Sequence, residues 1–184
     1  MKEIILVRHG EPDFTPPLKI SGKEIPKLLK KYNEAPLTNR SIPPKRLRFL
    51  AHNSIVICSD LPRSVQSAKR CGVNPDIVDP LFEESIPPHF QNDLFRLSPK
   101  NWLIFSRIVG FIGFSNNGES FIHTKKRAKR AADILIKESK KNRVLLFGHA
   151  LFNIFIAREL IKAGFIGKRV PAKKYWEFGN YRLL

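Results

Sequence analysis

The sequence predicts an α/β fold, a three-layer αβα sandwich around a mostly parallel central sheet. Short aliphatic runs of strand length alternate along the chain with longer segments that carry helix start and stop signals. Such alternation is typical of βαβ units, in which helices cover both faces of a parallel sheet. The length of 184 residues and the 42% of hydrophobic residues favour one domain with a buried core. We therefore expect a single domain over residues 1–184, with an insertion or lid at about 80–117.

The first half of the chain contains three aliphatic runs with helical segments between them. Each run ends at polar or turn-forming residues, as buried strands do. Ser21 and Glu24 have the spacing of a helix capping box, although Pro26 leaves the start of that helix open. Pro62 suits the first turn of a helix. The predicted elements are strands at residues 2–7, 55–58 and 77–78 and helices at 21–32, 45–52 and 63–71.

The second half begins with an irregular, proline-rich stretch. Its apolar segment 102–114 is too short to span a bilayer and contains Arg107. We favour burial of this segment as a lid packed over the core. The alternative is a dimer contact or a membrane-surface patch, because large exposed apolar patches usually mark a partner. The remaining predicted elements are a helix that Ser120 caps and that runs to about 140, a strand at 143–147, a helix at 150–163 that Gly164 closes, and a strand at 175–178.

The chain is strongly basic, with 33 Lys and Arg against 16 Asp and Glu and a formal net charge of +17. Charge on this scale attracts phosphorylated small molecules, phosphoproteins, nucleic acid and acidic membranes alike, and it also serves solubility. Five cations lie within residues 125–130, which we interpret as a solvated helix face in preference to an anion-docking surface. No RNA-binding or DNA-binding signature accompanies them, so no specific nucleic-acid partner is expected.

The cysteine content and the hydropathy pattern bear on the compartment. Cys58 and Cys71 are too few for a disulfide framework, which indicates a reducing environment. The apolar run at residues 4–7 is far shorter than the core of a secretory signal, and no transmembrane segment is expected. We expect a cytoplasmic protein that is a monomer or a homodimer.

Reactive and cationic side chains collect where three predicted strands end. Arg8 and His9 follow the first strand, Ser59 and then Arg63 follow the second, and His149 follows the fourth. Ligands of open α/β sheets bind outside the carboxyl ends of the strands. Two arginines can donate paired hydrogen bonds to phosphoryl oxygens, and a neutral imidazole is nucleophilic near physiological pH. Two histidines and two arginines at one edge therefore predict a site for a dianionic phosphoryl group.

Four motifs carry a resemblance to a known family. They are Arg8-His9-Gly10-Glu11, the segment SDLPRSVQSA at residues 59–68, Gly118-Glu119-Ser120 at the start of a helix, and Gly148-His149-Ala150 after a late strand. In this order and spacing, the chain resembles the histidine phosphatase superfamily of phosphoglycerate-mutase-like proteins from residue 4 to about 160. The resemblance implies that His9 becomes a phosphohistidine, that Arg8 and Arg63 hold the phosphoryl oxygens, and that His149 completes the pocket.

The family resemblance also implies a carboxylic acid after the third strand, which gives a proton to the leaving group. Glu83 and Glu84 stand at that place, and we favour Glu84 because the following residues 86–87 fit the version of the motif in which the second position matches. Thr15 stands where many members have an Asn that touches phosphate, which is a departure from the pattern. His89 lies in the insertion and is a candidate for the substrate entrance.

The resemblance implies a phosphomonoester hydrolase that acts through a covalent phosphohistidine on His9. The expected substrate is a phosphorylated small molecule or a phosphoprotein. A phosphoryl mutase and a non-catalytic basic module that binds phosphorylated or polyanionic ligands are the alternatives. The chain is shorter than typical mutases, which favours the phosphatase. His52, His89 and His123 lack metal-ligand spacing with one another or with cysteine, so surface positions are favoured for them. The chemistry that the resemblance implies requires no metal, and no cofactor is expected.

Overall fold

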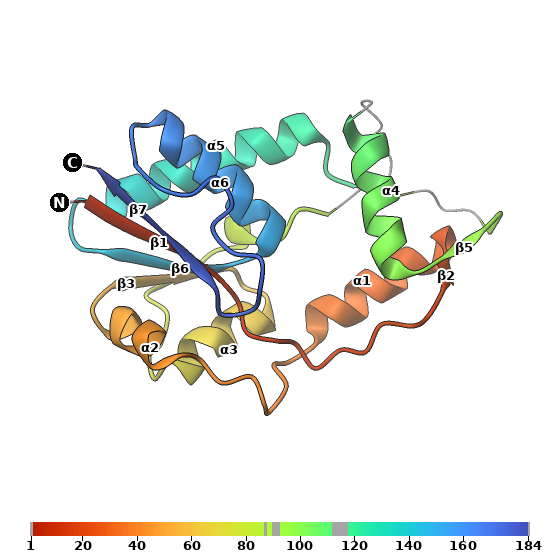
Figure 1. Ribbon diagram of the computed structural model, residues 1–184, viewed down its shortest axis with the longest axis horizontal. Helices are drawn as coiled ribbons and strands as arrows, with labels where there is room; N and C mark the ends of the chain where they lie inside the picture. Colours follow the sequence, from red (N-terminus) through yellow and green to blue (C-terminus); the bar gives the residue numbers. More distant parts are fainter. Residues whose placement is uncertain (1, 87, 90–92, 112–117, 184) are drawn as a thin grey trace.

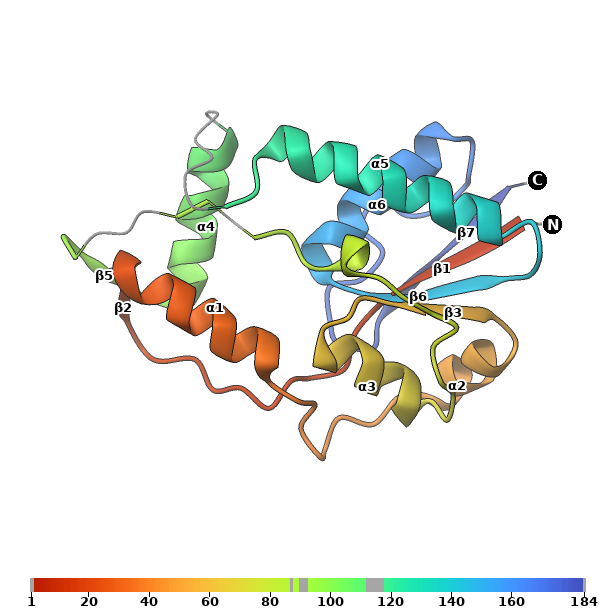
Figure 2. The same ribbon diagram turned by 180° about the vertical axis from the view of Figure 1, so that it is seen from behind.

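A five-stranded sheet forms the centre of the fold, with helices on both of its faces (Figures 1 and 2). The computed structural model describes residues 2–86, 88–89, 93–111 and 118–183, without the side chains of 107 and 109–111. The strand order is β4-β3-β6-β1-β7, in which the first four strands are parallel and β7 is antiparallel at the edge. The predicted α/β fold class is confirmed. The strands are β1 (Lys2–Arg8), β3 (Ile55–Cys58), β4 (Ile77–Val78), β6 (Val144–Gly148) and β7 (Phe178–Leu183).

The helices cover the two faces of the sheet in separate groups. Two of them, α5 and α6, pack on the face that presents Ile4 and Leu6, whereas α2 and α3 pack on the face that presents Ile5 and Val7. Successive side chains of a strand point to opposite faces, so the buried central residues of β1 contribute to both layers of the core. The helices are α1 (Ile25–Glu34), α2 (Lys45–His52), α3 (Pro62–Arg70), α4 (Pro99–Phe111), α5 (Phe121–Glu138) and α6 (Ala150–Lys162), with 3-10 turns at Gly22–Glu24 and Pro80–Phe82.

The predicted helix starts and stops are mostly confirmed. The backbone N–H of Ser21 donates to the Glu24 carboxylate, as the capping-box spacing predicts, and Pro26 lies in the first turn of α1. Ser120 caps α5 by accepting from the N–H of His123. Gly164 has a φ of +93° just after α6, a conformation that favours glycine over residues with a Cβ.

The predicted last strand, at residues 175–178, is wrong in its bounds. The backbone N–H groups of Lys173 and Lys174 donate to the Glu177 carboxylate, and Trp176 has a φ of +63°. These contacts fold the segment into a turn, because extended backbone is incompatible with that φ. The edge strand β7 begins only at Phe178.

A smaller group of elements lies beside the sandwich (Figure 1). Trp102 of α4 is buried with Ile20 and Ile25 in an apolar cluster separate from the main core, and its indole N–H donates to the Ile20 carbonyl oxygen at 2.8 Å. In the described part of the predicted lid, Trp102 and Phe105 therefore pack on this cluster and not on the main core, and residues 112–114 of the lid lie outside the described ones. The group contains α1, α4 and a two-stranded sheet of β2 (Ile20–Ser21) and β5 (Arg96–Leu97). On α4, the side chains of Leu103, Ile104 and Ile108 are exposed.

The sheet register brings the ends of three parallel strands together. Arg8 of β1 is aligned with Gly148 of β6, and Cys58 of β3 is aligned with Phe147. The residues that follow these strands therefore meet at one edge of the sheet, as the sequence predicts. None of the described helices has the length and apolar character that a membrane span requires.

Candidate active site

His9 lies buried directly after β1. Its Nδ1 is 2.7 Å from the carbonyl oxygen of Gly10. A carbonyl oxygen only accepts, so Nδ1 carries the ring proton and Nε2 keeps its lone pair. Burial, assisted by the positive charge of Arg63 and then of Arg8, lowers the pKa of His9 to about 3. The ring is therefore neutral at physiological pH, with the bare nitrogen that a nucleophile requires.

His149 faces His9 from the end of β6. The two ring centroids are 5.1 Å apart, and the His149 side chain is fully buried. Its Nε2 lies 2.8 Å from the hydroxyl oxygen of Ser59, while its Nδ1 is buried without a hydrogen-bond partner among the described residues. Burial, followed by the neighbouring His9 and Arg63, holds the pKa of His149 well below its usual value. This imidazole too is neutral.

Arg63 enters the site from the first turn of α3 and is almost completely buried. Its terminal nitrogens donate to the carbonyl oxygen of Tyr32 at 3.2 Å and to the side-chain oxygen of Asn33 at 3.2 and 3.3 Å. The Tyr32 ring centroid lies 4.5 Å from the guanidinium carbon. The end of α1 thus fixes the guanidinium in place, which is the preorganisation that an electrostatic donor needs.

Arg8 is fixed by the turn that precedes β7. It donates to the carbonyl oxygen of Lys173, and its guanidinium carbon lies 4.2 Å from the ring centroid of Tyr175. The same tyrosine ring has its centroid 5.7 Å from that of His9. Tyr175, Tyr32 and Asn33 are site residues that the sequence analysis missed, because nothing in their local sequence marks them; only the tertiary fold brings them to the arginines.

Three buried nitrogens beside His9 have no hydrogen-bond partner in the part of the chain that the structure describes. They are Nε of Arg8, Nε of Arg63 and Nδ1 of His149. An unpaired buried polar group costs about 1–3 kcal/mol, so native proteins rarely retain several together without a function. A phosphoryl group has several acceptor oxygens and would satisfy such donors.

Glu83 and Glu84 differ in what their carboxyl groups contact. Glu84 accepts from the backbone N–H groups of Leu151 and Phe152 at 3.1 and 2.9 Å, so both of its oxygens are engaged by the first turn of α6. Glu83 is half-buried and lies against Asp60; burial first, and then the hydrogen bond and charge of Asp60, raise its pKa. Of the two, Glu83 has the surroundings that help a carboxyl group to keep a proton.

Arg127 holds the loop that carries these glutamates. It donates to both carboxylate oxygens of Glu119 at 2.8 and 2.7 Å and to the carbonyl oxygens of Leu81 and Glu83 at 2.8 and 2.9 Å. Its guanidinium carbon lies 3.7 Å from the ring centroid of Phe152 in α6. This residue therefore departs from the predicted solvated face, whereas Lys125, Lys126, Lys129 and Arg130 are exposed as predicted.

We predict that Arg127→Met destabilises the protein by about 2–3 kcal/mol, because the change removes the ion pair with Glu119 and the hydrogen bonds to two carbonyl oxygens while keeping an alkyl chain on Phe152. The measurement is the midpoint of urea unfolding. Lys126→Met is the matched control, since this exposed neighbour should shift stability by no more than about 0.5 kcal/mol. Equal midpoints for the two variants would contradict the prediction.

Two other sequence candidates are less closely tied to this site. Thr15 is exposed on the loop after β1. His89 is buried next to residues that lie outside the described ones, so its place at the substrate entrance stays a prediction. Within residues 2–86, 88–89, 93–111 and 118–183, no group of three or more His, Cys, Asp or Glu side chains could hold a metal ion.

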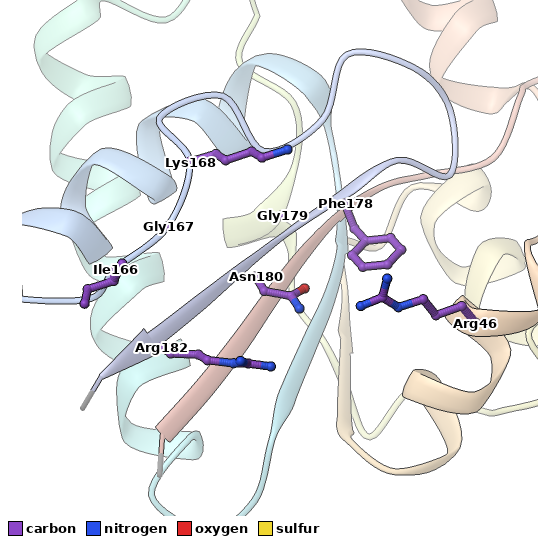
Figure 3. Close-up of a pocket in the computed structure, with 8 residues that line it drawn as sticks. All are labelled: Arg46, Ile166, Gly167, Lys168, Phe178, Gly179, Asn180 and Arg182. Carbon is purple, nitrogen blue, oxygen red and sulfur yellow. The ribbon is translucent and has the colours of Figure 1, made fainter.

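A groove of about 610 Å³ lies along β7 and shares no residue with the site (Figure 3). Its charged lining residues are Arg46, Lys168 and Arg182, of which Arg182 is paired with Glu3 at 2.9 Å. The groove adds to the basic surface of the protein and is separate from the strand ends that carry His9.

Solved structures with a similar fold include the product of an open reading frame and two phosphatases. The product of an open reading frame from Mycobacterium tuberculosis has a TM-score of 0.63 at 18% identity, covering 97% of this chain and 89% of that one. A mycobacterial glucosyl-3-phosphoglycerate phosphatase has a TM-score of 0.55 at 16% identity, and the match covers 88% of this chain and 80% of that one. A phosphoserine phosphatase mutant from Entamoeba histolytica, in complex with phosphoserine, has a TM-score of 0.55 at 16% identity, and the match covers 88% of this chain and 81% of that one. At these identities the likeness is one of fold.

The family assignment comes from the sequence. No curated protein matches the chain. The histidine phosphatase superfamily (branch 1), in contrast, matches residues 4–169, a range that includes His9, Arg63 and His149. Because this match spans nearly the whole chain and the fold agrees with it, the protein belongs to the histidine phosphatase superfamily, branch 1.

Proposed function

We propose that the protein is a phosphomonoester hydrolase that acts through a covalent phosphohistidine on His9. The observation that carries the proposal is the set of three unpaired buried nitrogens, from Arg8, Arg63 and His149, beside a neutral His9 with a bare Nε2. A nucleophile, fixed donors for the equatorial oxygens and a carboxylic acid are what phosphoryl transfer requires. Membership of the superfamily supports the same reaction class.

The reaction has two steps. In the first, Nε2 of His9 attacks the phosphorus atom, the bond between phosphorus and the ester oxygen breaks, and Glu83 gives its proton to the leaving oxygen. In the second, the Glu83 carboxylate takes a proton from water, the water oxygen attacks phosphorus, and the bond to Nε2 breaks to release inorganic phosphate. Arg8, Arg63 and His149 hold the phosphoryl oxygens throughout.

Our choice of Glu83 as the acid departs from the sequence-based preference for Glu84. The support is that Glu84 is engaged by two backbone N–H groups of α6, whereas Glu83 has a raised pKa and lies near Arg63. Glu84 is instead a positioning residue that fixes the helix directly after His149.

The proposed substrate is a phosphorylated small molecule or a phosphoprotein. Relatives of similar fold include a glucosyl-3-phosphoglycerate phosphatase and a phosphoserine phosphatase, which supports hydrolysis of a phosphomonoester. The strongly basic chain would assist the capture of an anionic substrate. Cys58 and Cys71 are both free thiols, in keeping with the cytoplasmic location that we also propose.

The test is release of inorganic phosphate from a panel of phosphomonoesters, including phosphoserine and phosphorylated sugars, in buffer with a chelator. We expect release without added metal and, after an alkaline quench that preserves the bond between nitrogen and phosphorus, one phosphoryl group on His9 by mass spectrometry. Transfer between two hydroxyls of one substrate would identify a mutase, and salt-sensitive binding without turnover would identify a binding module; either result would overturn the proposal.

The pH dependence of kcat/KM should lack the acid limb of an ordinary histidine. Because the pKa of His9 is lowered to about 3, the nucleophile stays neutral between about pH 5 and 7. The raised pKa of Glu83 has the opposite consequence: activity falls as the pH rises through that pKa and the proton donor is lost. The measurement uses two substrates with different second phosphate pKa values, since a limb that moves with the substrate belongs to it. A fixed acid limb near 6.5 in both profiles would contradict the prediction.

A further inference from the structure

The two histidines of the site have hydrogen-bond partners of different kinds. Nδ1 of His9 contacts a backbone carbonyl oxygen, which accepts only, whereas Nε2 of His149 contacts the hydroxyl of Ser59 at 2.8 Å. A hydroxyl can donate or accept. The direction of the bond between Ser59 and His149 therefore decides which nitrogen of His149 carries the proton.

The surroundings of Ser59 favour donation. This side chain is fully buried, and His149 is the hydrogen-bond partner of its hydroxyl among the described residues. A buried hydroxyl proton needs an acceptor, and the lone pair of a neutral imidazole supplies one. The backbone holds the geometry: the N–H of Ser59 donates to Ser64 Oγ at 3.1 Å, and the Ser64 hydroxyl donates to the carbonyl oxygen of Phe147.

We propose that Ser59 is a positioning residue that donates to Nε2 of His149 and so holds His149 in its Nδ1–H form, a neutral hydrogen-bond donor for a phosphoryl oxygen. The inference deepens the proposed phosphatase function and rests on it. The supporting geometry is that Nδ1 of His149 is buried and unpaired and that the two imidazole centroids are 5.1 Å apart.

The consequence is a site with two neutral histidines in the same Nδ1–H tautomer, which present different nitrogens to the phosphoryl group. His9 presents a lone pair to phosphorus, and His149 presents an N–H to an oxygen of the same group. In the other tautomer of His149, a lone pair would face the anionic oxygen, so the site would lose a donor and gain a repulsion. By fixing this tautomer, Ser59 makes neutral His149 a hydrogen-bond donor. The site thus gains a donor without a third positive charge beside Arg8 and Arg63.

The first experiment reads the tautomer directly. In a long-range ¹⁵N–¹H correlation spectrum of the ligand-free protein, we expect His149 to show a protonated Nδ1 and a bare Nε2. We expect Ser59→Ala, which removes only the hydroxyl, to shift His149 towards the Nε2–H form. A wild-type His149 with a protonated Nε2 would overturn the proposal, and so would a Ser59→Ala spectrum that is unchanged. This measurement needs no turnover, so its outcome is independent of whether the protein hydrolyses phosphomonoesters.

The second experiment measures the kinetic effect. Loss of one fixed donor to a developing oxyanion lowers kcat by about 10²-fold in other enzymes, and we expect a decrease of that order in Ser59→Ala, with a smaller change in KM. Ser139→Ala is the matched control, because Ser139 is also buried and donates to the Ile136 carbonyl oxygen at the far end of α5. Its kcat should match the wild type. A shifted tautomer with unchanged kcat would overturn the inferred role, and absence of turnover in the wild type would instead count against the phosphatase.

Discussion

His9→Ala is expected to reduce phosphate release by at least about 10⁴-fold, since it removes the atom on which we propose that the covalent intermediate forms. The neighbouring groups cannot replace it. Nδ1 of His149 is proposed to carry a proton, and the guanidinium groups of Arg8 and Arg63 are not nucleophiles. The measurement compares initial rates and the covalent phosphoryl adduct in the wild type and the variant.

The control for this experiment is His52→Ala. His52 is an exposed histidine at the end of α2, so its removal should leave both the rate and the adduct unchanged. Thermal unfolding of each variant checks the fold. If His9→Ala kept more than a tenth of the wild-type rate while remaining folded, phosphorus would have another acceptor and the proposed mechanism would be wrong.

The part of the site that lies at strand ends could be predicted from the sequence. The aliphatic runs that became β1, β3 and β6 are unambiguous, and the rule that parallel strands present their carboxyl ends together places Arg8, His9 and His149 at one edge. The positions of these residues depend on where the adjacent strands end, which is a local property of the backbone. The local sequence pattern is therefore sufficient to predict them.

The residues that orient the arginines could not be predicted in this way. Tyr32 and Asn33 reach Arg63 from the end of α1, and Tyr175 reaches Arg8 from a turn whose shape depends on Glu177. Each contact joins segments far apart in the chain. The turn itself was predicted as a strand, because alternation in the sequence does not reveal that a carboxylate will accept from two backbone N–H groups.

The choice between Glu83 and Glu84 illustrates the same limit at the scale of one residue. The 3-10 turn at Pro80–Phe82 ends in extended backbone at Glu83, with φ −60° and ψ 160°. In extended backbone, successive side chains point to opposite sides. Glu83 therefore contacts Asp60, and Glu84 contacts the start of α6. Which glutamate takes which position depends on the residue at which the turn ends.

Glu83→Gln is the second change with a large expected effect. The amide cannot give a proton, so kcat/KM for alkyl phosphomonoesters, which reports the first step, should fall by about 10²–10⁴-fold. For aryl phosphates with an acidic phenol as the leaving group, the decrease in kcat/KM should be much smaller, because such a phenolate leaves without protonation. The measurement is the dependence of kcat/KM on the pKa of the leaving group, which should become steeper in the variant.

Glu84→Gln distinguishes the roles of the carboxyl groups of Glu83 and Glu84. Its amide can accept from only one of the N–H groups of Leu151 and Phe152 with its oxygen, so the start of α6 should lose about 1–2 kcal/mol of stability. Activity should then decline to a similar degree for alkyl and aryl substrates, since a displaced helix start disturbs His149 and not the proton donor. If the steep leaving-group dependence belonged to Glu84→Gln, the acid would be Glu84, and the contacts of its carboxylate with α6 would have to break during turnover.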